Sequence, residues 1–199
     1  MINNAYDGIN PVIFDSDGTI VDSIIELIFG KGASDYTLGF GTPLTDPMTG
    51  EIVEAEIIIN GKILATSKTN AIERVYSTLL HEIGHFIGLG HSQLHLDFAF
   101  DEDPSNNLFL PVMFPIETED QFSSQSLSQD DCNILSTLYP KQSKMALLGN
   151  ITGTVQRPYG DGVQGANVIA AKSDSPLIYA YSCVSDFYIN YTGEFHFVG

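Results

Sequence analysis

A short run that holds three of the five histidines constrains this chain more than any other feature. His81 and His85 are four residues apart, so on a helix both imidazoles project from one face, with Glu82 beside them. Gly88 can adopt the left-handed conformation that ends a helix, and the following turn can bring His91 back as a third nitrogen ligand. Three histidines leave one position open on a tetrahedral zinc ion, as in catalytic zinc sites. The run therefore predicts one catalytic Zn²⁺.

The segment before this run has helical periodicity. Thr69 or Asn70 can cap the start of the helix, and Asn70 has Glu73 at capping-box spacing. Apolar residues then recur at helical intervals and predict a stripe that faces the core. The stripe consists of Ile72, Val75, Tyr76, Leu79, Ile83 and Phe86.

The full pattern His81-Glu82-x-x-His85-x-x-Gly88-x-x-His91 resembles that of the metzincin metallopeptidases. The resemblance implies a zinc endopeptidase that hydrolyses peptide bonds of a protein or peptide substrate. In such an enzyme, Glu82 would act as the general base, taking a proton from the zinc-bound water and passing it to the leaving amine.

Features after the third histidine are similar to those of the matrixin family. Ser92 follows that histidine, and residues 111–115 resemble the methionine turn, which would pack Met113 beneath the three imidazoles. Residues 127–139 resemble the matrixin terminal helix, with Ser128 as its cap. The similarity implies an α+β fold, a metzincin-type catalytic domain with a twisted, mainly parallel sheet, a long active-site helix and a C-terminal helix.

The sheet itself is less clearly marked. Residues 51–61 predict a strand that ends at an Asn-Gly turn, with residues 62–65 as a return strand. Residues 30–50 are rich in Gly, Thr, Pro and Asp and predict loops. The 51–61 strand is either an edge that adds an extended substrate as a further strand or an ordinary interior strand.

The N-terminal segment carries a competing motif. Residues 10–23 predict a strand followed by Asp15-x-Asp17-Gly-Thr, which resembles the first motif of the haloacid dehalogenase phosphatases. That resemblance would make Asp15 a nucleophile and Asp17 its assisting acid. The further parts of such a site are not found in order along the chain, so we favour a strand that runs into an Asp-Gly turn.

Composition limits the partners. The formal net charge is −17, from 25 acidic and 8 basic residues, so nucleic acid and anionic membranes would be repelled. No stretch has the apolar length of a membrane span, and the start has no export signal. We expect a secreted protein whose targeting segment lies upstream of this sequence. The acidic clusters at 15–22 and 97–103 suit either structural Ca²⁺ or solvated loops.

The remaining histidines and the cysteines predict no further site. His95 and His196 have no partner at ligand spacing, so the second, structural zinc of animal matrixins is not expected. Cys132 and Cys183 are too few for a disulfide framework and are expected to be buried apolar residues.

The pattern changes after the terminal helix. We predict a catalytic domain over residues 1–141, a linker over 142–150, and over 151–199 an incomplete β-sandwich that resembles the carboxypeptidase regulatory-like domain. Its expected strands are 151–155, 163–170, 177–181 and 194–198. The rivals to a zinc endopeptidase are a non-catalytic zinc-containing adhesin or binding protein and the phosphatase that uses Asp15.

Overall fold

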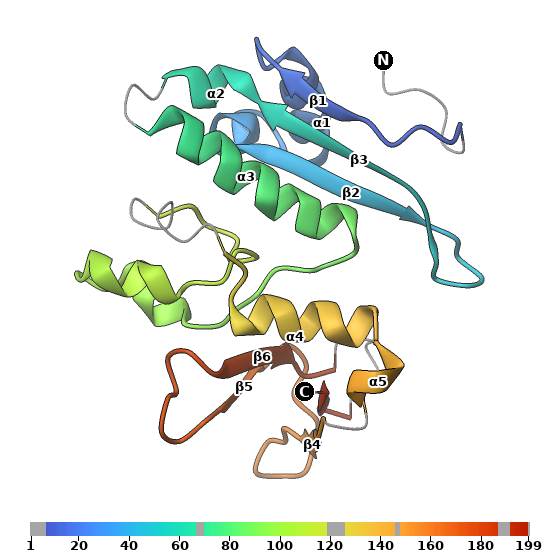
Figure 1. Ribbon diagram of the computed structural model, residues 1–199, viewed down its shortest axis with the longest axis vertical. Helices are drawn as coiled ribbons and strands as arrows, with labels where there is room; N and C mark the ends of the chain where they lie inside the picture. Colours follow the sequence, from blue (N-terminus) through green and yellow to red (C-terminus); the bar gives the residue numbers. More distant parts are fainter. Residues whose placement is uncertain (1–6, 67–69, 119–125, 146–147, 187–191, 199) are drawn as a thin grey trace. The chain divides into compact units, whose positions relative to one another are not determined.

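A computed structural model of the chain describes residues 7–66, 70–118, 126–145, 148–186 and 192–198. Helices and small sheets are mixed along it, so the predicted α+β class is confirmed at that level (Figure 1). The chain divides into two compact units, residues 1–90 and 91–199. This division reports spatial compactness, and the domain boundaries predicted from the sequence stay a prediction.

The first unit is built on a three-stranded sheet in the order β1-β3-β2. Its strands are β1 (Val12–Asp15), β2 (Gly39–Thr45) and β3 (Ile52–Asn60). β3 runs parallel to β1 and antiparallel to β2. The described sheet is therefore mixed, and the expectation of a mainly parallel sheet is not met.

The strand predicted over residues 51–61 exists, but it is the central strand and not an edge. The two edges are β1 and β2, and β2 lies in the region predicted to be loops. Its Gly and Pro content suggests a turn, yet Pro43 is compatible with an edge strand, because an edge strand leaves some of its N–H groups outside the ladder.

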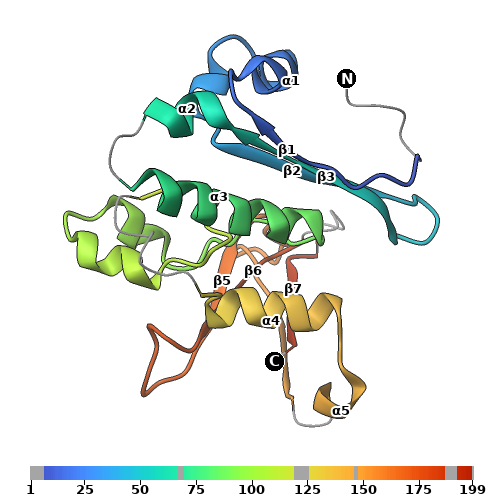
Figure 2. The same cartoon turned by 45° about the horizontal axis from the view of Figure 1, so that its top comes forward.

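Helices cover both faces of this sheet, with α1 (Thr19–Phe29) on one side and α3 (Ala71–Phe86) on the other (Figure 2). Alternation along β3 explains the two layers, since neighbouring side chains of a strand point to opposite faces. Ile58 packs with Val21 and Ile25 of α1. Ile57 and Ile59 pack on the other face, in a cluster with Leu64 that Val75, Leu79 and Phe86 of α3 join.

The predicted long helix is present as α3, but two expectations about it are wrong. Ile72, Tyr76 and Ile83 of the predicted stripe are exposed, because the sheet covers only the side of α3 that carries the other three. Asn70 sits at the N-cap in a left-handed conformation and makes no side-chain cap hydrogen bond. Thr69, the alternative cap, lies outside the described residues.

The turn after β1 leads into α1, so the predicted strand and Asp-Gly turn are confirmed. A 3-10 helix, η1 (Ala33–Tyr36), lies between α1 and β2. After β3 the chain forms the short helix α2 (Gly61–Thr66) where a return strand was expected. Asn60 explains part of this, since its side-chain oxygen accepts a hydrogen bond from the Ile63 N–H at 3.4 Å, and this contact favours a turn over a hairpin.

The second unit begins with two 3-10 helices, η2 (Leu96–Phe100) and η3 (Pro104–Phe109). The predicted terminal helix follows as α4 (Gln129–Leu138), and then the short helix α5 (Gln142–Met145). Ser128 caps α4 in a full capping box with Asp131, as its position predicted. Within this unit α4 lies against strand β6 (Figure 1).

Four strands end the described chain, and they pair as two separate antiparallel sheets, β4 with β7 and β5 with β6. They are β4 (Asn150–Thr154), β5 (Asn167–Ala171), β6 (Ala180–Val184) and β7 (Glu194–Val198). The last matches its predicted run and β4 begins one residue before its own, whereas β5 and β6 begin later than expected, at Asn167 and Ala180.

The two cysteines and the helix lengths also bear on expectations from the sequence. Cys132 and Cys183 are free thiols, but both are partly exposed and not buried as expected. No helix formed by the described residues is long and apolar enough to cross a membrane.

Candidate metal centre

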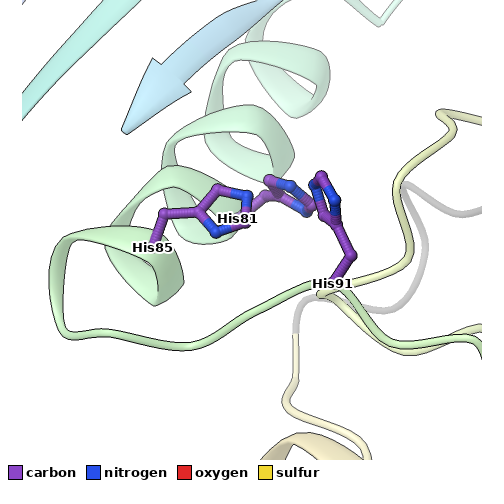
Figure 3. Close-up of side chains that lie close together, drawn as sticks. All are labelled: His81, His85 and His91. Carbon is purple, nitrogen blue, oxygen red and sulfur yellow. The ribbon is translucent and has the colours of Figure 1, made fainter. Parts of the chain in front are cut away.

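The three predicted histidines come together. One ring nitrogen from each of His81, His85 and His91 lies within 4.8 Å of the others, so the three side chains could hold one metal ion. Figure 3 shows the rings gathered, two from α3 and one from the segment that follows it. The His81 and His85 rings have centroids 4.7 Å apart and stand almost perpendicular, at 83°.

The turn that ends α3 brings the third histidine back toward the first two. Gly88 has a φ of 91°, the left-handed conformation that a residue without Cβ adopts at little cost. The Gly88 N–H donates to the carbonyl of His85 and the Leu89 N–H to that of Gly84, both at 2.9 Å. These two bonds close the helix and reverse the chain, as the glycine predicted.

The same turn orients one ligand. Nδ1 of His85 lies 2.8 Å from the carbonyl oxygen of Leu89. A carbonyl can only accept a hydrogen bond, so Nδ1 must carry the proton and Nε2 keeps its lone pair for a metal. Such a bond to the other ring nitrogen is the usual way in which a protein fixes a metal-binding histidine.

Glu82 is buried on α3, with 5% of its surface exposed, and it faces the edge strand β2. A Cβ placed on Gly39 would lie 2.8 Å from Cγ of Glu82, and one placed on Gly41 would lie 2.6 Å from the Glu82 carbonyl oxygen. Because strand residues two apart share a face, these two glycines together allow α3 to approach β2 this closely. Sequence reasoning missed them, although the Gly-x-Gly spacing was a signal.

The carboxyl of Glu82 has a raised pKa and one oxygen without a hydrogen-bond partner. Burial raises its pKa to about 7, and the backbone N–H of Gly41 opposes part of that rise. Its Oε2 atom has no hydrogen-bond partner. A buried carboxylate oxygen without a partner is costly unless another group completes it. A water molecule on a metal held by the neighbouring histidines would supply one, so the residues present are compatible with a bound metal ion.

Met113 lies in a tight turn, as predicted, and is fully buried. The Phe114 N–H donates to the Pro111 carbonyl at 3.1 Å, which closes the turn. Asp131 holds it from α4, because Oδ1 accepts the N–H of Met113 at 3.1 Å and Oδ2 that of Val112 at 3.0 Å. The packing of Met113 beneath the imidazoles stays a prediction. Asp131 lies in the first turn of α4, and its contact with the Met113 turn was not predicted from the sequence.

Ser92, the residue after the third histidine, is held by hydrogen bonds from both its backbone and its side chain. The N–H of Ser92 donates to the Met113 carbonyl at 2.8 Å, and its hydroxyl donates to Asp130 of α4. Asp130 is fully buried, and burial raises its pKa against the opposing effect of its hydrogen bonds. No pattern in the sequence pointed to Asp130, because its partners lie far away along the chain.

Two of the acidic residues suggested for calcium, Asp101 and Asp103, accept local hydrogen bonds. Asp101 accepts from Asp103 and Asn106, and Asp103 caps η3 by accepting from the Ser105 N–H. Within the described ranges, the histidine triad is the one group of three or more His, Cys, Asp or Glu side chains close enough to hold a metal. No three of the described acidic side chains lie close enough together to hold a calcium ion between them.

Asp15 and Asp17, the two acids of the phosphatase-like motif, accept backbone hydrogen bonds at the start of α1. Oδ2 of Asp15 accepts the N–H groups of Ile20 and Val21 at 2.8 and 2.9 Å, so this buried side chain caps α1. Asp17 accepts the N–H of Thr19 at 3.1 Å. Both interactions stabilise the turn between β1 and α1, as expected for a strand that ends in an Asp-Gly turn.

Comparison of the chain with family models, with curated proteins and with solved structures finds no match. The likeness to matrixins therefore depends on the motifs in the sequence. What the fold and site define directly is an α+β protein with a three-histidine centre that could hold a metal ion.

Proposed function

We propose that this protein is a zinc-dependent metalloendopeptidase of the metzincin type that acts outside the cell. The observation that carries the proposal is the convergence of three imidazoles beside a buried glutamate of the same helix. Imidazole nitrogens suit zinc, and three protein ligands leave a position for water or substrate. When bound, zinc would polarise a peptide carbonyl and acidify a water molecule.

The chain's own residues would divide the remaining work. His81, His85 and His91 would bind the metal, and the bond from His85 to the Leu89 carbonyl would keep one ring in a ligating tautomer. Glu82 would accept the proton of the attacking water on its unpartnered oxygen and deliver it to the departing amine. An amide needs this second transfer, because an amine leaves far more readily when protonated.

The edge strand β2 would position the substrate. It is bonded to β3 on one side, and no described strand pairs with its other side. An extended peptide could add there as a further strand, held through its main chain and so with little demand on its sequence. Gly39 and Gly41 of β2 lie against Glu82, so a peptide added to this strand would lie near the general base.

The test compares zinc content with cleavage. We expect one zinc per chain, cleavage of unstructured casein, and loss of cleavage with a chelator. Glu82→Ala should keep the zinc but lose cleavage, by about 10²-fold or more, because it removes the base and none of the ligands. Wild-type protein that holds zinc yet cleaves neither casein nor a peptide library would instead support a non-catalytic zinc-binding protein. Activity that needs magnesium and disappears in Asp15→Asn would support the phosphatase.

A further inference from the structure

Strands β5 and β6 are hydrogen-bonded to the segment that directly follows His91. Nδ2 of Asn167, the first residue of β5, donates to the Gln93 carbonyl at 2.9 Å. The Leu177 carbonyl, in the turn before β6, accepts from Nε2 of His95 at 3.2 Å. Two residues of this segment, Gln93 and His95, are thus hydrogen-bonded to the β5–β6 hairpin, which occurs more than seventy residues later in the chain.

The third connection is buried and passes through Asp130. One oxygen of this carboxylate accepts the Ser182 N–H at 2.6 Å, and the other accepts the Ser182 hydroxyl at 3.0 Å. That second oxygen also accepts the hydroxyl of Ser92. The two serine hydroxyls are themselves 3.3 Å apart. Ser92, Asp130 and Ser182 therefore form one network, and all three are buried.

Ser92 is the end of the network that matters for the metal, because it is bonded to His91 through the backbone. Its N–H is fixed by the Met113 carbonyl and its hydroxyl accepts the N–H of Leu94 at 3.1 Å, in addition to donating to Asp130. A residue fixed at its backbone and its side chain limits the positions of its neighbour. The anchoring of Ser92 therefore restricts the backbone position of His91.

We propose that Ser182 is a positioning residue of the metal centre, which holds Asp130 and through it Ser92 and the third ligand, His91. The β5–β6 hairpin is then a supporting part of the metal centre and not an appended module. The inference rests on the proposed zinc site. It does not require that the protein cleave peptides.

The main experiment measures the zinc dissociation constant of the full-length chain by competition with a chelator. Ser182→Ala removes the hydroxyl and keeps the N–H bond to Asp130. Residues that orient metal ligands typically change metal affinity by 10- to 100-fold, and since Ser182 acts through two intermediates we expect a loss of about 10-fold. Ser182→Thr keeps a hydroxyl and should restore the wild-type value. The Co²⁺-loaded Ser182→Ala protein should also show a shifted d–d absorption spectrum.

Ser185→Ala is the matched control. Ser185 directly follows β6 and is also buried, but its hydroxyl donates to the Val163 carbonyl and accepts the Ala166 N–H, and it does not bond to Asp130. It should lower the melting temperature of the zinc-free protein without changing zinc affinity. Equal zinc affinities for Ser182→Ala, Ser185→Ala and wild type would overturn the inference alone. Wild type that binds no zinc would overturn the proposed function as well.

A second variant covers the case in which Ser182→Ala does not fold. Asn167 is exposed, so Asn167→Ala removes its bond to Gln93 at little cost to the core. Its control is Asn150→Ala, which changes the same exposed residue type at the first position of β4. We expect weaker zinc binding for Asn167→Ala than for Asn150→Ala. Equal affinities for these two variants would contradict a contribution of the hairpin to the metal site.

Discussion

His85 and Glu82 lie on the same helix but meet opposite surroundings. The Nδ1–H of His85 is paired with a carbonyl at the end of its own helix, which leaves the other ring nitrogen as a ligand. Glu82 keeps one buried oxygen without a partner. A polar atom in that state is usually either a defect or a functional group. Its place between the first two histidines of the triad favours function.

The triad leads to a prediction for single residues. His85→Ala should lower the bound zinc from about one ion per chain to nearly none, because two imidazoles bind zinc far more weakly than three. Zinc would be counted by atomic emission after gel filtration in a buffer with a weak chelator. His196→Ala is the control, since His196 is exposed on β7 and lies outside the triad. Equal zinc in both variants would show that the metal binds elsewhere.

At the scale of elements, the approach of α3 to β2 depends on glycine. Gly41 faces the backbone of Glu82, and a methyl group there would also lie 3.0 Å from Oε2 of Glu82 and 3.1 Å from Cβ of His85. The neighbouring Phe40 points the other way, into the cluster with Ile58. One short strand thus serves the core with one face and the candidate site with the other.

Gly41→Ala should therefore separate α3 from β2. Overpacking a tight interface typically costs about 1–3 kcal/mol, and here the crowded atom is a backbone oxygen that cannot rotate away. Urea unfolding would measure the change. Gly90→Ala is the matched control, because a Cβ there meets open space and the residue does not have a left-handed φ; it should be neutral or stabilising by up to about 1 kcal/mol. Equal stability of the two variants would contradict the close approach.

These elements also show what the sequence could and could not predict. The three histidines, Gly88 and the Ser128 cap were predictable, because their geometry depends on neighbours within about two helical turns. β2 was not, because Gly39, Gly41 and Pro43 resemble turn residues until β3 pairs with them. The network of Asp130 with Ser92 and Ser182 was not predictable either, since its partners are 38 and 52 residues away along the chain.

At the scale of the whole molecule, the large negative net charge lowers the stability of the folded chain. A net charge of −17 on 199 residues makes the folded chain repel itself. Lys62 forms ion pairs with Asp22 and Asp35, and Lys172 forms one with Asp174, and all of these side chains are partly exposed. Exposed pairs contribute little, typically under about 1 kcal/mol, so they do not offset the excess of carboxylates.

Screening should therefore stabilise the protein, and calcium should do no more than other divalent ions. Raising NaCl from a low concentration to about 0.15 M shortens the Debye length to about 8 Å, so the melting temperature should rise. Each kcal/mol corresponds to about 2–4 °C for a chain of this size. CaCl₂ and MgCl₂ at equal concentration should then give equal further shifts, because no three acidic side chains among the described residues lie close enough together to hold one ion. Differential scanning calorimetry of the zinc-loaded protein would measure both effects. A larger shift with calcium than with magnesium, saturating at low concentration, would instead reveal a specific calcium site and revive that interpretation of the acidic residues.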